Sequence, residues 1–253
     1  MKSGFHVVIP ARYESSRLPG KPLVDLEGVP MVVRVAQNAL ASGAQSVTVA
    51  ADDARVVNAA TKAGFEALLT STEHQSGSDR VYEVAQLKGW ATSEVVVNLQ
   101  GDEPLLGSDH VRRVGVALHE DPTVDVCTLR DPILEPERLN DENVVKVVTD
   151  RLDRALYFSR APIPSGRSDS GYDRLARQGN FGWRHVGLYA YRVGALAKFV
   201  ELDASELEQQ ELLEQLRLLD YGIAIKVLAL DEIVAGGVDT PADLARVRSQ
   251  LRI

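Results

Sequence analysis

Cysteine is almost missing from this chain, because Cys127 is the only one among 253 residues. A single cysteine excludes an internal disulfide and any metal site built from several cysteines. It lies within the apolar stretch 124–129, where we interpret it as strand packing rather than as a nucleophile.

The chain also lacks an excess of positive charge and a long apolar run. Its formal net charge is -8, which argues against a nucleic-acid surface, since phosphate backbones are bound by broad Lys/Arg patches. No run approaches membrane-spanning length, and the N-terminus has no long apolar segment of the kind found in signal peptides. We therefore expect no membrane insertion and a reducing, cytoplasmic setting.

Two standard phosphate-binding loops are missing as well. The dinucleotide fingerprint needs glycines directly after a strand, and the ATPase loop needs Ser or Thr where Pro22 succeeds Lys21. The apolar strand 7–10 instead leads into a loop with Arg12, Arg17, Gly20 and Lys21. Ligands of α/β folds bind at the carboxyl ends of strands, so this loop predicts a triphosphate site held mainly by side chains. The alternative is a solvated basic turn.

Strand and helix patterns alternate through the first half of the chain, as in a doubly wound α/β fold. Strands are expected at 7–10, 46–51, 65–69 and 94–99, and helices at 30–42, 53–63 and 78–88. The second half is less regular and indicates a smaller lobe, a dimer arm, or both. Expected there are strands at 144–149, 155–158, 185–191 and 225–230, an exposed loop at 165–182, one helix from the Ser205 cap to Gly222, and a last helix after Thr240.

Two aspartates are candidate ligands for magnesium. Asp102 comes directly after the most apolar strand, and Asp239 precedes the Thr240 cap. Magnesium usually takes one or two protein carboxylates while substrate phosphates and waters fill its other positions. Alternatively, Asp102 only caps a turn before Pro104, and Asp239 only complements a helix dipole.

Other polar residues carry weaker signals. Ser76 and the backbone donors of the loop 74–80 could meet a base or sugar while Arg80 points at an anion, although a capped helix start is an equal explanation. Arg160 comes after an aromatic strand, and His185 and Tyr189 share one strand face, where solvation or packing is the ordinary role.

Taken together, these segments resemble the CMP-Kdo synthetase (3-deoxy-manno-octulosonate cytidylyltransferase) family. The motifs that carry the resemblance run in the family's order over nearly the whole chain, at residues 10–22, 74–81, 98–104, 156–160, 185–191, 213–217 and 237–241. One departure is Ser78, where the family more often has threonine, which retains the hydroxyl.

The resemblance implies a nucleotidyltransferase-like, doubly wound mixed sheet with a smaller dimerisation lobe. We expect residues 1–253 to form a single nucleotidyltransferase domain, with the inserted lobe or dimer arm at approximately 130–205. The implied reaction joins CTP and Kdo, 3-deoxy-D-manno-octulosonate, to give CMP-Kdo and pyrophosphate with Mg²⁺, for lipopolysaccharide synthesis. The anomeric hydroxyl of Kdo would attack the α-phosphorus in line. A homodimer is implied, and no nucleic-acid partner.

The resemblance also implies roles for individual residues, with Arg12, Lys21 and Asp102 as catalytic groups. The nucleotide would be bound by Ala11, Arg12, Arg17, Lys21, Ser76 and Gly77, and the metal by Asp102 and Asp239. Kdo would be bound by Arg80, Gln100, Arg160, His185, Tyr189, Glu214 and Gln215. Alternatives that stay open are a cytidylyltransferase for sialic acid or another 2-keto acid sugar, a hexose-phosphate nucleotidyltransferase, and a non-catalytic nucleotide-binding regulator.

Overall fold

The first strand, β1 (Phe5–Ala11), is buried along its whole length and lies inside a mainly parallel sheet. It pairs in parallel with β4 (Val47–Ala51) and with β6 (Val95–Asn98), and β4 pairs in parallel with β5 (Glu66–Leu69). The computed structural model describes residues 4–15, 17–165 and 179–251, and the chain divides into two compact units. These four strands belong to the first unit, which comprises Met1–Asp121, Leu188–Val200 and Ala235–Ile253.

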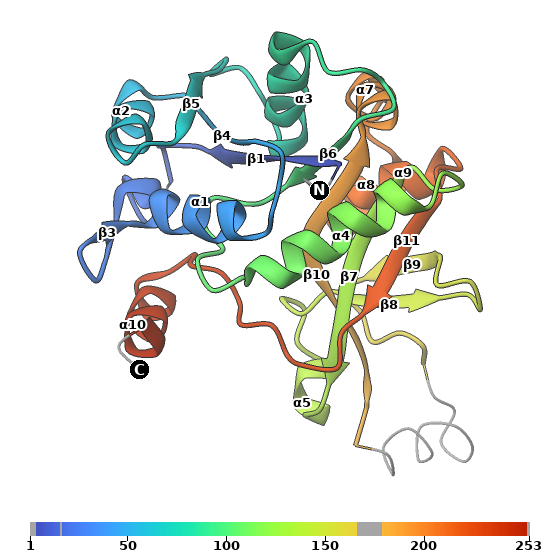
Figure 1. Ribbon diagram of the computed structural model, residues 1–253. Helices are drawn as coiled ribbons and strands as arrows, with labels where there is room; N and C mark the ends of the chain where they lie inside the picture. Colours follow the sequence, from blue (N-terminus) through green and yellow to red (C-terminus); the bar gives the residue numbers. More distant parts are fainter. Residues whose placement is uncertain (1–3, 16, 166–178, 252–253) are drawn as a thin grey trace. The chain divides into compact units, whose positions relative to one another are not determined.

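Helices cover both faces of this sheet (Figure 1). α1 (Met31–Ala41) and α4 (Ser108–Glu120) pack against one another and on β1, whereas α3 (Gly77–Lys88) packs on the opposite face. α2 (Ala54–Lys62) packs on β4 and β5. The first unit also contains η1 (Lys21–Leu23), the hairpin of β2 (Asp25–Leu26) and β3 (Val29–Pro30), α7 (Val193–Glu201, which ends at the unit boundary) and α10 (Pro241–Leu251).

The expected alternation of the first half is confirmed, with bounds that differ by one or two residues. It arises because β1, β4 and β6 are short, mainly apolar runs rich in β-branched residues and are buried on both faces, as parallel strands require. Sequence patterns missed α4, α7 and the β2–β3 hairpin.

The second unit comprises Pro122–Gly187 and Glu201–Val234. Its β7 (Val126–Ile133) pairs in parallel with β11 (Ile225–Ala229), and β8 (Lys146–Thr149) pairs antiparallel with β9 (Ala155–Ser159). The lobe expected at 130–205 overlaps this unit without sharing its bounds. Cys127 is fully buried in β7, in agreement with a packing role. Most of the loop expected at 165–182 lies outside the described residues.

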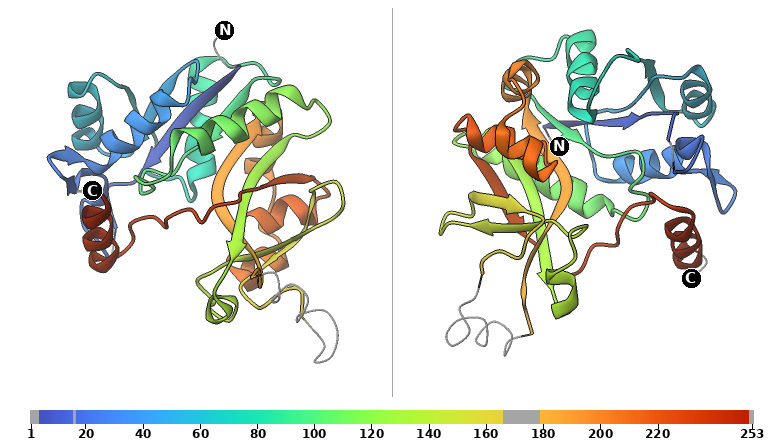
Figure 2. Two further views of the ribbon diagram at one scale, coloured as in Figure 1. Left: turned by 60° about the horizontal axis from the view of Figure 1, so that its bottom comes forward. Right: turned by 180° about the vertical axis from the view of Figure 1, so that it is seen from behind.

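One long strand runs through both units. β10 (Gly182–Arg192) begins in the second unit, where it neighbours β7 and pairs with β8, and ends in the first, where Tyr189–Arg192 pair antiparallel with β6. Figure 2 shows this strand from two further sides. The second unit also contains α5 (Pro136–Leu139) and two short helices, α8 (Glu206–Glu211) and α9 (Gln215–Asp220).

The single helix expected between Ser205 and Gly222 is wrong, because α8 and α9 are separated at Leu212. Leu212 has φ 53° and ψ 47°, the left-handed conformation, and it is 75 % exposed. The leucine therefore leaves the apolar face to which its spacing assigned it. At this break the carbonyls of Glu211 and Leu212 accept hydrogen bonds from the side chain of Arg160. This tertiary contact takes the place of hydrogen bonds that a continuous helix would make.

Among the described residues, no helix is both long enough and apolar enough to cross a membrane.

Candidate active site

The first unit carries a pocket at the carboxyl ends of β1 and β6. Because these strands are parallel neighbours, the loop after β1 and the loop after β6 emerge at the same edge of the sheet. The pocket measures about 410 Å³. Its lining includes Ala11, Arg12, Arg17, Lys21, Gln100, Asp102 and Asp239, which the sequence singled out for the nucleotide, the metal and Kdo.

Lys21 is the centre of this pocket's charges. Its Nζ lies 2.5 Å from Asp102 Oδ2 and 2.8 Å from Asp239 Oδ1, and Arg17 Nη2 lies 3.3 Å from the same Asp239 oxygen. Burial alone would lower the pKa of Lys21, but the two carboxylates outweigh it, and the pKa is raised above its ordinary value. Two aspartates far apart in the sequence thus converge on one ammonium group.

The helix start after Asp239 depends on another residue. Asp243 accepts hydrogen bonds from the backbone N–H and the hydroxyl of Thr240, and the Thr240 hydroxyl accepts from the Asp243 N–H. This arrangement satisfies the first turn of α10 in the manner of a capping box. The Asp239 carboxylate instead contacts Lys21 and Arg17, so its role lies in the pocket rather than in the cap of α10.

Main-chain contacts bring the two aspartates together. The N–H of Val238 donates to the carbonyl of Asp102 at 2.9 Å. A Cβ on Gly237 would lie 2.8 Å from Glu103 Oε1 and 2.9 Å from the Asp102 carbonyl, and a Cβ on Gly101 would lie 2.9 Å from the Pro10 carbonyl. Glycine is needed at both positions because any side chain would push these backbones apart.

The donor set of this pocket fits a divalent metal that arrives with phosphate. Asp102 and Asp239 offer hard carboxylate oxygens at a point where one cation, the Lys21 ammonium, already sits between them. The described residues contain no group of three or more His, Cys, Asp or Glu side chains able to hold a metal. Magnesium is commonly bound by one or two protein carboxylates, while substrate phosphates and water complete its coordination.

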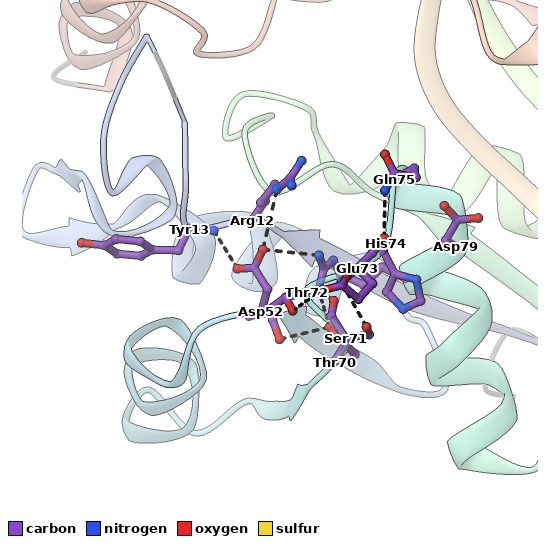
Figure 3. A network of polar contacts seen from close by, with 12 residues as sticks. Arg12, Tyr13, Asp52, Thr70, Ser71, Thr72, Glu73, His74, Gln75 and Asp79 are labelled. Carbon is purple, nitrogen blue, oxygen red and sulfur yellow. Dashed lines mark hydrogen bonds and ion pairs between the residues drawn. The ribbon is translucent and has the colours of Figure 1, made fainter.

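The sequence patterns did not single out Asp52. This residue links the cationic loop after β1 to the polar loop before α3 (Figure 3). Its Oδ1 accepts from the backbone N–H of Tyr13 at 2.9 Å, and its Oδ2 lies 3.9 Å from Arg12 Nε and 3.4 Å from Arg80 Nη2. A signal was present, because Asp52 comes directly after β4, the parallel neighbour of β1. The rule that ligands bind at the carboxyl ends of strands, applied to β4, would have indicated Asp52.

Arg80 lies beneath this network. It is only 3 % exposed, and its Nη1 donates to Thr70 Oγ1 at 2.5 Å and to the Ser71 carbonyl at 3.1 Å. Burial lowers the pKa of the Arg80 guanidinium, and the carboxylate of Asp52 opposes that shift. The contacts of Arg80 therefore hold the loop at Thr70 and Ser71 in place. Arg80 is absent from the lining of the 410 Å³ pocket.

Ser76 and Gly77 begin α3. Ser76 Oγ accepts from the Asp79 N–H at 3.2 Å and Asp79 Oδ2 accepts from the Ser76 N–H at 2.9 Å, a capping box that agrees with the capped-helix alternative. A Cβ on Gly77 would lie 3.2 Å from Gln100 Nε2, so the start of α3 touches the pocket-lining loop. Both Ser76 and Gly77 lie beside the pocket rather than in its lining.

Gln100 and Tyr189 are connected through Asn98. Tyr189 on β10 pairs with Asn98 on β6, and Asn98 Oδ1 accepts from Gln100 Nε2 at 3.2 Å. Tyr189 is buried and stacks on Tyr191, with 5.7 Å between the ring centroids. This placement agrees with the packing role of Tyr189.

His185 belongs to the second unit, where it is half-buried against aromatic and hydroxyl groups. Its ring contacts Phe158 edge to face at 4.9 Å between centroids, and its Nε2 lies 3.2 Å from Thr128 Oγ1. Burial, with the neighbouring charge of Arg184, lowers the pKa of His185 to about 3. The imidazole is therefore neutral at physiological pH.

Arg160, Glu214 and Gln215 are also in the second unit, where α9 packs on β9. Glu214 is the N-cap residue of α9, and Gln215 is its first residue. Gln215 is 9 % exposed, and its buried Nε2 has no hydrogen-bond partner among the described residues. An unsatisfied buried amide is costly unless a ligand or water completes it.

Comparison with known proteins identifies the family. A family model described as "Cytidylyltransferase" matches residues 6–226. The chain belongs to the cytidylyltransferase family. The chain is 46 % identical over 252 residues to a 3-deoxy-manno-octulosonate cytidylyltransferase of Methylococcus capsulatus, covering 99 % of this chain and 98 % of the relative. It is 48 % identical to the protein of that name from Halorhodospira halophila, over 98 % of this chain and 97 % of the relative.

One solved structure agrees with this assignment, and a more distant one shares the fold. A CMP:2-keto-3-deoxy-manno-octonic acid synthetase complexed with CTP matches with a TM-score of 0.89 and 41 % identity, over 98 % of both chains. A cytidylyltransferase from Leptospira borgpetersenii, 15 % identical with a TM-score of 0.62 over 98 % of this chain and 87 % of that one, shares the fold. The expected resemblance and the nucleotidyltransferase-like α/β fold are thus confirmed.

Proposed function

We propose that this chain transfers CMP from CTP to the anomeric hydroxyl of Kdo, giving CMP-Kdo and pyrophosphate for lipopolysaccharide synthesis. The observation that carries the proposal is the convergence of Asp102 and Asp239 on Lys21, beside two further cations, in one pocket. The names of the relatives supply the acid sugar, which the pocket alone does not define.

The triphosphate of CTP is the ligand we assign to the cationic loop. Arg12 and Arg17 have side chains 60 % and 63 % exposed, so both guanidinium groups can turn toward an anion. The largely buried carboxylate of Asp52, which Arg12 would leave, keeps the Tyr13 N–H and Arg80 as partners. Lys21 would stabilise the charge that grows on the departing pyrophosphate. Ala11, Ser76 and Gly77 would lie along the cytosine or ribose, where small residues let backbone donors approach.

Asp102 and Asp239 are the proposed ligands of Mg²⁺. The bound metal would lower the pKa of the attacking hydroxyl and neutralise phosphate oxygens. Lys21 would exchange its contacts with the two carboxylates for contacts with phosphate oxygens, because an ammonium and a metal ion repel one another at such short range.

In the proposed step a bond forms between the anomeric oxygen of Kdo and the α-phosphorus, and the bond from that phosphorus to the β-phosphate oxygen breaks. The hydroxyl proton leaves to solvent, and pyrophosphate carries away the bond electrons. No covalent enzyme intermediate is needed. Catalysis then consists of alignment and of charge stabilisation by Arg12 and Lys21, while Asp102 would hold the metal.

The Kdo-binding residues stay a prediction: Arg80, Gln100, Arg160, His185, Tyr189, Glu214 and Gln215. Three observations support members of this set. The neutral imidazole of His185 can share a hydrogen bond with a sugar hydroxyl, Gln215 has a buried amide to satisfy, and Arg160 suits the carboxylate of an acid sugar. The contacts of Arg80 favour an indirect role.

A pyrophosphate-release assay tests the proposal by crossing CTP, UTP, ATP and GTP with Kdo, sialic acid and a second 2-keto acid sugar, each with and without Mg²⁺. Turnover confined to CTP, Kdo and Mg²⁺ is expected. Preference for sialic acid would move the chain to the neighbouring sugar class, and CTP binding without product for any sugar would favour a regulator. We further propose that the protein is a cytoplasmic homodimer. Sedimentation equilibrium would measure the mass of the assembly.

A further inference from the structure

Arg160 is held by the described residues at both its backbone and its side chain. Its backbone N–H donates to Glu211 Oε2 at 2.9 Å, and its carbonyl accepts from the Nζ of Lys146. Its Nε donates to the Glu211 carbonyl at 2.7 Å, Nη1 to the Glu142 carbonyl at 2.9 Å, and Nη2 to the Leu212 carbonyl at 3.4 Å. Three of these contacts hold the guanidinium and two hold the backbone, so the side chain has little freedom to move.

The groups that hold Arg160 occupy unfavourable positions for their own elements. Glu211 is the last residue of α8, an end of the helix where the helix dipole disfavours a negative charge. Leu212 takes the left-handed conformation without being glycine, and Lys146 is fully buried. Local strain that the surroundings maintain is characteristic of functional sites.

The guanidinium of Arg160 keeps its charge available in this frame. Its three acceptors are neutral carbonyl oxygens, and they use three of the five N–H donors that an arginine carries. One N–H remains on each terminal nitrogen, and such a pair can meet both oxygens of a carboxylate.

We propose that Glu211 is a positioning residue that fixes Arg160 as a preformed receptor for the carboxylate of the acid sugar. Its Oε2 holds the Arg160 backbone, its Oε1 accepts from Ser159 Oγ at 2.6 Å, and its own carbonyl holds Nε. The break between α8 and α9 is explained by this role, because a continuous helix would engage the carbonyls of Glu211 and Leu212 in its own hydrogen bonds. The proposal rests on the function proposed above.

Steady-state kinetics of Glu211→Gln test the proposal. The amide keeps one oxygen for the Arg160 N–H and can turn its N–H₂ group to the Ser159 hydroxyl, but the charge-assisted hydrogen bond of the carboxylate is lost. We expect KM for Kdo to rise by about tenfold or more, corresponding to the loss of one charge-assisted hydrogen bond, with KM for CTP unchanged. Glu206→Gln on the same helix, where the carboxylate is exposed, is the matched control and should leave both KM values unchanged.

A double-mutant cycle separates positioning from general damage. If Glu211 acts through Arg160, the rise in KM for Kdo caused by Glu211→Gln should disappear in an Arg160→Lys background. Additive effects, or an equal rise in KM for both substrates, would overturn the proposal.

The backbone amide resonance of Arg160 gives a readout that does not depend on the substrate. Its proton should lie downfield in the wild-type chain and move upfield in Glu211→Gln but not in Glu206→Gln. An unmoved resonance would overturn the positioning role whatever the sugar is. A wild-type chain that turns over no CTP with Kdo, while the resonance moves as expected, would instead contradict the proposed function and restrict this inference to the frame around Arg160.

Discussion

Val238 and Asp102 are joined by a main-chain hydrogen bond of 2.9 Å, with the N–H of Val238 as donor. This bond ties the segment before α10 to the loop after β6, so Asp239 reaches the ammonium of Lys21 that Asp102 also binds. The geometry of the proposed metal site therefore depends on backbone contacts as much as on its carboxylates.

Gly237→Ala should separate the two aspartates. The new Cβ would meet the Asp102 carbonyl at 2.9 Å and Glu103 Oε1 at 2.8 Å, closer than real Cβ contacts allow, so the segment must move. We expect pyrophosphate release to fall by about tenfold or more, because misplacement by about 1 Å is enough for such a loss. Gly236→Ala is the control, since its Cβ would meet only Arg246 at 3.9 Å. Equal activities of the two variants would contradict this account.

Asp102→Asn should abolish turnover with CTP, Kdo and Mg²⁺ while leaving the fold intact. The amide keeps the shape of the carboxylate but loses its charge, and Lys21 still has Asp239 as a partner. Pyrophosphate release and a thermal melt measure the two effects. Asp109→Asn, at an exposed position early in α4, should change neither. Near-normal turnover by Asp102→Asn would remove its assigned role.

Asp52→Asn should lower the stability of the chain as well as its affinity for CTP. The variant removes the ion pair between Asp52 and the buried guanidinium of Arg80 and leaves only the longer-range attraction of Glu83 and Asp79, which we expect to lower the free energy of unfolding by about 3 kcal/mol. The loop of Arg12 and Tyr13 would also loosen and raise KM for CTP.

Urea unfolding of the Asp52→Asn variant measures this loss. Adding Arg80→Met should recover part of the stability, because the unpaired charge is then gone. Asp53→Asn, which keeps an N-cap acceptor, is the control. A loss within about 0.5 kcal/mol, as at ordinary surface positions, would show that Asp52 does not support Arg80.

His185 should make stability depend on pH on the acid side. Its folded-state pKa is about 3, below the unfolded value of 6.5, so the unfolded chain binds the proton first. The stabilisation is complete above pH 6.5 and is lost as pH falls toward 3, by up to about 1.4 kcal/mol per pH unit. Urea unfolding of the wild-type chain and of His185→Gln should show a shallower slope for the variant, and identical slopes would contradict the assignment.

Leu212→Gly should raise stability, because glycine adopts φ 53° without the clash that a side chain brings. The exposed leucine loses little burial, and we expect a gain of about 1 kcal/mol in the free energy of unfolding. Gln210→Gly, exposed and inside α8, should lower it by a similar amount. Losses at both positions in thermal or urea unfolding would mean that the side chain of Leu212 contributes contacts of its own.

Periodicity found most elements of the first unit because their burial is local and regular. β1, β4 and β6 are apolar runs, and α2 and α3 begin at good cap residues. Periodicity failed at Leu212, where spacing indicated one helix and the chain formed two. The carbonyls of Glu211 and Leu212 bind Arg160, which lies far earlier in the sequence and is invisible to any local pattern.

The candidate site likewise has features that the sequence determines and features that only the folded chain determines. Composition and motif order by themselves determined the absence of disulfides, the cationic loop, the two aspartates and the resemblance to a family, since residue types alone carry this information. Only the tertiary structure decided that Asp102 and Asp239 meet at Lys21, that Arg80 is buried beneath Asp52, and that Glu211 holds Arg160. Hydrogen bonds and ion pairs depend on distances between atoms, and those distances are set only once the chain has folded.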